Sequence, residues 1–476
     1  MNEKCSQQET VPAVSTVSLP LPVEIFREND VPGVVGRGLD RSAGEAIARA
    51  FGTFLRRAGV RRAAIGCDNR PSSEGLYRAA ISGLRAAGCD AVAIGLAVTP
   101  MVYFALTHLR LSGGMMVTAS HNPPEFNGFK LAYGAGTIYG AQIQELRAIA
   151  AAGEFAEGAG GAFETQAVQP AYAAMLAEKI HLGPRRLRVA VDCGNGAAGP
   201  FVPGILEAWG CEVLPLYCDL DPAFPHHYPD PVDPRNLTDL IGLVKAGRAD
   251  LGIGIDGDGD RLGVVDEQGE IVWSDVLMAL FWQEILPAHP GTIAPVEVKC
   301  SQALIDQIRR LGGRPELTPT GHSLIKARMR QVGAPFAGEM SGHFFFADEY
   351  YGYDDAIYAA GRLLRMLSRT DVPLSSLAAK VARYHATPEM RVACPEDRKR
   401  QIVAALADEF RERHDVVDVD GVRVIFPDGW GLVRASNTQA VLVVRAEGAT
   451  PDALDRAKDT LEKSLRRFPE VAPIDW

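Results

Sequence analysis

The chain has 476 residues, which predicts roughly three domains at about 150 residues each. The 49 Lys and Arg residues against 59 Asp and Glu residues give a net charge of −10, which argues against a general nucleic-acid-binding protein. Hydrophobic residues make up 47% of the chain and charged residues 23%, values that exclude wholesale disorder, collagen and coiled coil.

The sequence carries no signal for a membrane or an export pathway. There is no run of about 18 apolar residues, and residues 1–22 are polar, without the apolar core of a signal peptide. We therefore expect a cytoplasmic protein without membrane association, with 1–22 as a flexible tail. The eight cysteines form no C-x-x-C pair and most lie inside apolar runs, which is typical of buried free thiols in a reducing compartment.

Short apolar runs alternate with helical patterns in the first part of the chain. Strands are predicted at Arg62–Cys67, Ala91–Ile94 and Gly114–Thr118. Helices are predicted near Ser72–Ala87 and Met101–Leu109. This alternation indicates an α/β layer with a largely parallel sheet.

The same plan recurs twice further along the chain. A predicted strand at Leu187–Val191 leads through a glycine-containing turn into a helix, and a strand at Thr292–Val298 leads into a helix at Gln302–Leu311. The recurrence indicates three related α/β units.

The C-terminal part of the chain has a different pattern. Strands are predicted at Val416–Asp420, Val422–Phe426 and Ala440–Val444, and helices near Arg398–Arg413 and Asp452–Arg467. A separate α+β domain is therefore expected there. The predicted division after the tail is 23–167, 168–270, 271–384 and 385–476.

The first motif, Thr118–Pro124, directly follows a predicted strand. A hydroxyl placed at the carboxyl edge of an α/β sheet lies where such folds bind ligands, so Ser120 is a candidate nucleophile. Lys130 lies a few residues further on and supplies a cation. The alternative is an ordinary Asn-Pro turn in which Ser120 caps a neighbouring segment.

The second motif places Asp256, Asp258 and Asp260 at every second position between two predicted strands. Three carboxylates at this density need a divalent cation, and oxygen ligands suit Mg²⁺. The alternative is a calcium loop of the EF-hand type, with Glu267 at its twelfth position. Arg261 stands where that loop requires Gly, and the flanking segments look like strands.

The third motif, Gly338–His343, brackets short polar side chains between two glycines. Glu339 and Ser341 are of the type that bonds sugar hydroxyls, and His343 is a candidate general acid or base. The alternative is a structural histidine next to glycine.

The fourth motif, Arg434–Thr438, combines a guanidinium with hydroxyl groups and backbone amides. These groups can form a phosphate cradle, although a strand end with an exposed Arg has the same composition. Lys299 and His322 are supporting cations, each weak on its own.

These four motifs, in this order, resemble the α-D-phosphohexomutases, and most closely the bacterial phosphomannomutase/phosphoglucomutase group. The likeness runs from about Phe26 to the C-terminus and includes TASHNPPEFNGFK, DGDGDR, GEMSGH and RASNT. It implies three related mixed α/β domains and a smaller C-terminal α+β domain around a central cleft.

The resemblance also implies roles for individual residues. Ser120 would be a phosphoserine, and Mg²⁺ would be held by Ser120, Asp256, Asp258 and Asp260. Residues with catalytic roles would be Ser120, His121, Lys130, Arg261 and His343. Substrate-binding residues would be Lys299, Gly321, His322, Glu339, Ser341, His343, Arg434, Ser436, Asn437 and Thr438.

The implied activity is interconversion of hexose 6-phosphate and hexose 1-phosphate, for mannose or glucose, through a phosphoserine and a hexose 1,6-bisphosphate. We expect a monomer that takes a small hexose phosphate as substrate and binds no nucleic acid. Met340 matches the glucose/mannose type, and a phosphoglucosamine mutase is the alternative substrate class. Asn29 and Pro32 depart from a Tyr and an Arg of the R-x-Y-D-I-R-G pattern of relatives. A degenerate member that binds sugar phosphates without turnover is therefore a second alternative.

Overall fold

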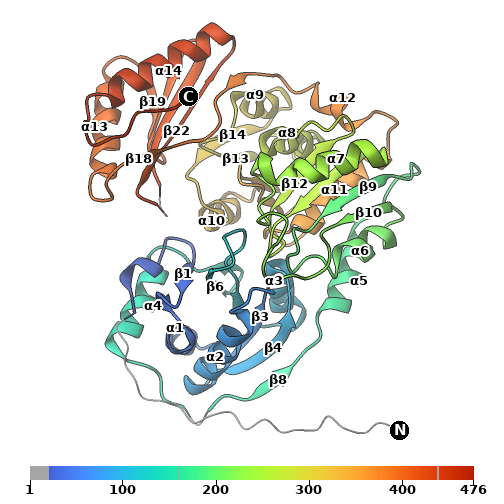
Figure 1. Cartoon of the computed structure of the whole chain (residues 1–476), viewed down its shortest axis with the longest axis vertical. Coiled ribbons are helices and arrows are strands. Elements are labelled where there is room, and N and C mark those ends of the chain that lie inside the picture. Colours follow the sequence, from blue (N-terminus) through green and yellow to red (C-terminus); the bar gives the residue numbers. More distant parts are fainter. Residues whose placement is uncertain (1–20, 159, 437–438) are drawn as a thin grey trace.

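The computed structural model describes residues 21–158, 160–436 and 439–476. Most of the predicted tail, together with Cys5, Asn437 and Thr438, lies outside these ranges. Four units follow one another around the molecule in Figure 1. The blue first unit lies at the bottom, the green second unit at the right, the yellow and orange third unit above the centre, and the red fourth unit at the upper left.

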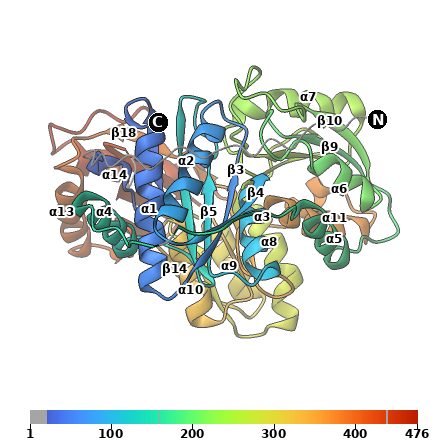
Figure 2. The same cartoon turned by 90° about the horizontal axis from the view of Figure 1, so that it is seen from below.

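The first unit is built on a mixed sheet with the strand order β2-β1-β6-β5-β3-β4-β8, in which β7 pairs with β6. Its strands are β1 (Val31–Val35), β2 (Gly38–Leu39), β3 (Arg62–Cys67), β4 (Asp90–Leu96), β5 (Gly113–Val117), β6 (Phe126–Tyr133), β7 (Gly136–Thr137) and β8 (Phe163–Thr165). Its helices are α1 (Arg41–Arg57), α2 (Ser73–Ala86), α3 (Thr99–His108) and α4 (Ala141–Ala152). Figure 2 shows α1 and α2 side by side.

Alternation along β3 explains how this sheet is covered. Ala63 and Ile65 pack with α1 and α2 on one face, whereas Ala64 packs with α3 on the other. The core of the sheet, β3 with β4 and β5, is parallel as predicted. Strand β6 has no counterpart among the predicted strands and pairs antiparallel with both β5 and β1, so the sheet is mixed.

The second unit has the strand order β10-β9-β11-β12. Its elements are β9 (Arg188–Asp192), β10 (Glu212–Leu216), β11 (Leu251–Ile255), β12 (Leu262–Asp266), α5 (Gln169–Lys179), α6 (Val202–Ala208) and α7 (Thr238–Gly247). Strands β9, β10 and β11 are parallel, and β12 returns antiparallel to β11. The second motif is the connection between β11 and β12.

The third unit contains two small strand pairs and five helices. Strands β13 (Ile293–Glu297) and β14 (Arg314–Thr318) are parallel, and β15 (Phe336–Gly338) and β16 (Phe344–Phe346) are antiparallel. The helices are α8 (Ser274–Ile285), α9 (Gln302–Arg310), α10 (His322–Val332), α11 (Ala356–Ser368) and α12 (Leu374–Ala378). One continuous apolar core joins this unit to the second unit and to the α3 face of the first.

The fourth unit is an antiparallel sheet with two helices and its own core. Its elements are β17 (His385–Ala386), β18 (Met390–Ala393), β19 (Asp415–Val417), β20 (Val422–Phe426), β21 (Gly429–Ala435), β22 (Val441–Gly448), α13 (Lys399–Arg411) and α14 (Pro451–Leu465). The predicted strand Val416–Asp420 ends early, at Val417, and Asp420 lies in the turn before β20. The α+β character expected from the sequence is confirmed.

Within the described ranges, no helix is both long enough and apolar enough to cross a membrane. The seven cysteines of those ranges are free; six are buried and Cys218 is half-buried. Short 3₁₀ helices occur at Val23–Ile25, Pro234–Leu237 and Leu286–Ala288.

Candidate active site

Ser120 lies three residues beyond the end of β5, in a left-handed backbone conformation with φ of 52°. Its N–H donates to the hydroxyl of Thr118 at 2.8 Å, which holds the turn. The Ser120 hydroxyl donates to Asp256 Oδ2 at 2.6 Å and lies 3.1 Å from His121 Nδ1. The first two motifs, far apart in the chain, therefore meet at this hydroxyl.

The buried side chain of Arg70 organises the turn that carries Ser120. Asp68 accepts from its Nε at 3.1 Å and fixes the direction of the guanidinium. The two Nη groups donate, at 2.7 to 3.2 Å, to the backbone carbonyls of Ser120, Asn122, Pro123 and Phe126. One planar five-donor group thus satisfies four backbone carbonyls at once.

The connection between β11 and β12 brings Asp256, Asp258 and Asp260 together. All three are fully buried, and each offers a carboxylate oxygen within 4.8 Å of the others. Gly257 lets this loop approach Ser120, because a Cβ there would lie 2.3 Å from the carbonyl oxygen of Ser120. The position therefore requires glycine.

Lys130, in β6, is the cation nearest to the three carboxylates. Its Nζ lies 2.7 Å from Asp258 Oδ2 and also bonds Asp260. Burial and the neighbouring carboxylates raise the pKa of Asp256 well above its ordinary value, and burial raises the pKa of Asp260 to about 6. Burial acts on Asp258 as well, but the contact with Lys130 outweighs it and lowers the pKa of Asp258.

The aspartate cluster fits a hard divalent cation. Asp258 Oδ1 and Asp260 Oδ1 are buried and have no hydrogen-bond partner, so two oxygen ligands are directed at the site without a competing bond. The EF-hand alternative finds no support, because both flanks are strands and the carboxylate of Glu267 bonds Ser375 instead.

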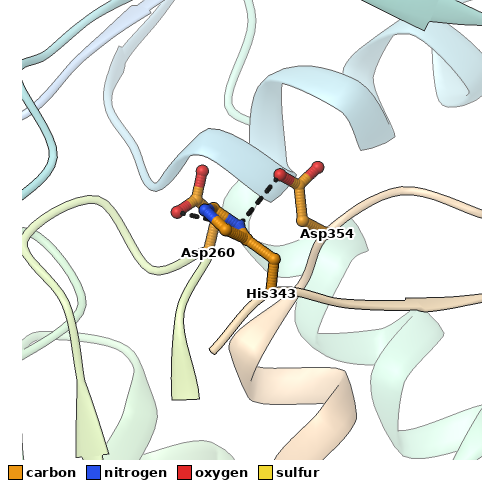
Figure 3. A group of neighbouring side chains, drawn as sticks. All are labelled: Asp260, His343 and Asp354. Carbon is orange, nitrogen blue, oxygen red and sulfur yellow. Dashed lines mark ion pairs between the residues drawn. The ribbon is translucent and has the colours of Figure 1, made fainter. Parts of the chain in front are cut away.

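A second group with metal-ligand chemistry lies next to this one and consists of Asp260, His343 and Asp354 (Figure 3). Arg261 Nε donates to His343 Nε2 at 3.1 Å, which leaves the ring proton on Nδ1. That atom lies 3.2 Å from Asp354 Oδ2 and 3.6 Å from Asp260 Oδ1. Lys326 also pairs with Asp354 at 2.7 Å, so one cation already lies against this group.

His322 and His343 stack on each other with ring centroids 5.2 Å apart, and both direct Nδ1 at Asp354 from 3.2 Å. Burial lowers the pKa of each to about 4. Both rings are therefore neutral near pH 7. In His343 the acceptor atom Nε2 already receives the Nε–H of Arg261, so it can take another proton only when Arg261 releases it.

The third motif forms a second polar network around Glu339. Gly321 N–H donates to Glu339 Oε1 at 2.7 Å, and the hydroxyl of Ser341 donates to Oε2 at 3.3 Å. Burial, followed by the nearby Glu297 carboxylate, raises the pKa of Glu339 to about 7. Glu297 itself accepts from the N–H of Met340 at 2.8 Å.

Lys299 adds a buried cation to this network. Its Nζ lies 3.2 Å from Glu297 and 2.9 Å from Glu389 in the fourth unit. Although burial alone would lower the pKa of Lys299, the two carboxylates outweigh it and raise the pKa. Lys299 is therefore charged and lies where the third and fourth units meet.

The fourth motif lies at the end of β21. Arg434 Nε donates to Asp420 Oδ2 at 2.8 Å, and Ser436 is buried, with its carbonyl accepting from Lys399 Nζ at 2.6 Å. Asn437 and Thr438 lie outside the described residues. Their predicted phosphate contacts remain predictions.

The two departures from the N-terminal pattern lie beside the same networks. Asn29 approaches Gly321, and its buried Oδ1 has no hydrogen-bond partner. Pro32 lies in β1 opposite Gly128 in β6, the strand that carries Lys130. No cation replaces the expected arginine at Pro32 itself.

Sequence reasoning missed several partners of these residues: the buried Arg70, Glu297 and Asp354, and the half-buried Asp420. For Arg70 a signal was available, because Asp68-Asn69-Arg70 directly follows β3 at the sheet edge where ligands bind. Glu297 begins the EVKCS stretch of the resemblance but had no role assigned to it. Asp354 and Asp420 stand in no motif, and their contacts join segments that are separated in the sequence.

Family models match almost the whole chain in four consecutive segments. Phosphoglucomutase/phosphomannomutase alpha/beta/alpha domains I, II and III match residues 23–157, 170–269 and 273–384, and the C-terminal domain of the same family matches residues 389–464. The chain belongs to the phosphoglucomutase/phosphomannomutase family. The fold class predicted from the sequence, three mixed α/β domains and a C-terminal domain, is confirmed.

Individual members of the phosphoglucomutase/phosphomannomutase family match over nearly their full length. A phosphomannomutase/phosphoglucomutase of Pseudomonas aeruginosa is 42% identical over 97% of this chain and 100% of its own. A phosphoglucomutase of Neisseria gonorrhoeae is 38% identical over 94% and 98%. The crystal structure of a phosphoglucomutase/phosphomannomutase family protein from Burkholderia thailandensis superposes with a TM-score of 0.89 at 40% identity, covering 95% of this chain and 99% of the other. The predicted resemblance to the bacterial members of this enzyme family is confirmed.

Proposed function

We propose that the protein is a phosphohexomutase that interconverts hexose 6-phosphate and hexose 1-phosphate, with mannose and glucose as its sugars. The observation that carries the proposal is the 2.6 Å contact between the Ser120 hydroxyl and Asp256. It places a potential phosphoryl carrier against three buried carboxylates, two of which, Asp258 and Asp260, have an unpartnered oxygen. Family membership supports the same activity.

In this proposal Asp256, Asp258, Asp260 and a phosphoserine oxygen of Ser120 hold Mg²⁺. When bound, Mg²⁺ would neutralise the charge of the phosphoryl group. Lys130 and Arg261 supply fixed positive charge beside it. Arg70 holds the Ser120 turn rigid, so that the phosphoryl group is presented in one orientation.

Phosphoryl transfer then needs positioning and a proton acceptor. The free hydroxyl oxygen of the sugar phosphate attacks the phosphorus of phospho-Ser120, and Ser120 Oγ departs. The proton of the sugar hydroxyl passes to His343 Nε2 after Arg261 Nε has released that atom. The product is a hexose 1,6-bisphosphate. After the bisphosphate turns round, Ser120 Oγ takes the other phosphoryl group and the proton returns.

The second network recognises the sugar and its non-transferred phosphate. Glu339 and Ser341 bond sugar hydroxyls beside Lys299, Gly321 and His322. Arg434 and Ser436, with the predicted Asn437 and Thr438, hold the phosphate. Such a clamp, distant from Ser120, serves either end of the sugar and so suits both half-reactions.

A coupled assay with Mg²⁺ and a catalytic amount of glucose 1,6-bisphosphate tests the activity. Conversion of mannose 1-phosphate or glucose 1-phosphate to the 6-phosphate is expected, and no conversion of either would refute the proposal. Ser120→Ala should lower turnover by orders of magnitude while the protein remains folded. Glucosamine phosphate in the same panel tests the alternative substrate class.

One observation favours a second candidate, a sugar-phosphate-binding protein without turnover. Pro32 and Asn29 lack the charge and the hydroxyl that the family pattern places near the phosphoserine. Tight binding of glucose 6-phosphate by calorimetry, together with an intact mass that never shows a phosphoserine after incubation with glucose 1,6-bisphosphate, would support that candidate.

A further inference from the structure

Asp420 joins the third and fourth units through one carboxylate oxygen. Its Oδ2 accepts from Arg434 Nε at 2.8 Å within the fourth unit. The same oxygen accepts from the backbone N–H of Thr320 at 3.0 Å. Thr320 lies between β14 and α10, next to the predicted substrate residues Gly321 and His322. The carboxylate therefore contacts both proposed substrate-binding regions.

The fourth unit fixes the position of Asp420 relative to Arg434. Gly421 follows with φ of 84°, and a Cβ there would lie 2.4 Å from the carbonyl oxygen of Val433 and 2.6 Å from Arg434 Cβ. The turn before β20 is thus pressed against β21 at Arg434. Only glycine permits both the left-handed conformation and this close approach.

Thr320 connects Asp420 to the residues that surround Glu339. The Thr320 hydroxyl donates to Glu297 Oε1 at 2.8 Å, and Glu297 Oε2 accepts from the N–H of Met340 at 2.8 Å. The neighbouring Gly321 N–H donates to Glu339 itself. A short hydrogen-bonded path therefore runs from the phosphate-binding Arg434 to the sugar-binding loop.

We propose that Asp420 is a positioning residue for substrate binding. Its bond to Nε fixes the rotation of the planar Arg434 guanidinium, and hence the direction of the two Nη groups that would meet a phosphate. Its bond to Thr320 sets the separation between that guanidinium and the sugar-binding loop. A hexose phosphate then meets both regions without first having to align them. This inference rests on the proposed function.

Loss of Asp420 should not separate the two units, because other contacts hold the same interface. Arg423 Nη1 donates to the carbonyls of Val298 at 2.7 Å and Cys300 at 3.0 Å, and Arg445 Nη1 donates to the carbonyl of Lys299 at 2.6 Å. A variant at Asp420 therefore tests alignment rather than assembly.

The test is Asp420→Asn, which keeps the size of the side chain and removes its charge. The KM for glucose 1-phosphate should rise by about tenfold, the size expected for losing a charge-assisted hydrogen bond. The kcat should stay within about twofold, because Asp420 touches no reacting atom. A fall in kcat with unchanged KM would overturn the inference.

Asp418→Asn is the matched control, since it lies in the same turn with its side chain 61% exposed and paired with Arg411. Its KM should equal that of the wild type. Equal KM values for the two variants would overturn the inference. Should Asp420→Asn fail to fold, Asp420→Glu keeps the charge but displaces it, and an unchanged KM in that variant would equally overturn it.

Arg434→Lys separates this inference from the function on which it rests. Lysine lacks the Nε–H and the planar fork, so KM should rise in this variant. In the Arg434→Lys background, Asp420→Asn should raise KM by a clearly smaller factor than it does in the wild-type background, because the two residues act together. If Arg434→Lys leaves KM unchanged, the proposed phosphate clamp itself fails. If Arg434→Lys raises KM, and Asp420→Asn raises KM by the same factor in both backgrounds, only the positioning role of Asp420 fails.

Discussion

Asp354 and Asp355 are consecutive buried carboxylates that face different parts of the molecule. Asp354 pairs with Lys326 and receives Nδ1 of both His322 and His343. Asp355 accepts from the hydroxyls of Tyr172 at 2.8 Å and Tyr350 at 2.6 Å, and caps α11 through the N–H of Tyr358. Asp354 thus contacts residues of the candidate site, whereas Asp355 stabilises the packing around α11.

This pair provides a matched test of how the histidines are held. Asp354→Asn should lower kcat/KM by about a hundredfold, the range of general acid–base effects, because the Nδ1 protons lose their carboxylate. Asp355→Asn should retain the activity and lower the melting temperature. Nitrogen-15 NMR of His343 should show the Nδ1–H form in the wild type and in Asp355→Asn. Equal activity of the two variants would contradict the assignment.

Arg70 should be necessary for the geometry of the Ser120 turn. In Arg70→Lys one ammonium replaces a fork that bonds four carbonyls, so kcat should fall by about tenfold or more. Limited proteolysis between residues 118 and 126 should become faster. Arg78→Lys, on the exposed face of α2 and paired with Glu74, is the control and should match the wild type in both measurements.

Gly257 should tolerate no side chain, since a Cβ there would lie 2.3 Å from the Ser120 carbonyl oxygen. Gly257→Ala should displace the aspartate loop from Ser120 and raise the Mg²⁺ concentration needed for half-maximal activity. Gly242→Ala, in α7, meets nothing within 4 Å and should stabilise the fold by about 0.5–1 kcal/mol. An unchanged Mg²⁺ requirement in Gly257→Ala would contradict this prediction, because it would show that the loop accommodates a Cβ without weaker Mg²⁺ binding.

The lowered pKa of His322 makes stability depend on pH. Burial lowers this pKa from 6.5 to about 4, so between these values the unfolded chain binds a proton that the folded protein does not. Its stabilising contribution is complete above pH 6.5 and is lost as the pH falls toward 4. Urea denaturation at pH 7.5 and at pH 5 should therefore show that the free energy of unfolding falls more between these two pH values for the wild type than for His322→Asn. Equal losses would mean that His322 titrates normally.

Much of the local structure follows directly from the sequence. The predicted bounds of β3 and β20 coincide with those in the structure, because each is a short, largely apolar segment between turn residues. The four motifs were found because they stand at strand ends, where short polar residues follow buried runs. Strand β6 was missed because its first residues belong to the stretch that was interpreted as a turn motif.

The partners of the motifs could not be read in the same way. Arg70 contacts Ser120, and Asp420 contacts Thr320, only after distant segments have packed together. Each of these residues is an ordinary charged residue in its own local sequence. The sequence pattern reports local propensity and periodicity, whereas these roles come from contacts between segments that are far apart in the sequence.

The left-handed conformation of Ser120 bears on the choice of nucleophile. Glycine and asparagine adopt such a backbone readily, but neither carries a hydroxyl. Threonine carries one, yet its β-branch crowds the backbone in this region and would make the turn more strained. Serine is therefore the hydroxyl amino acid whose side chain is small enough for the turn. The backbone conformation at this one position restricts which amino acid could carry the proposed phosphoryl group.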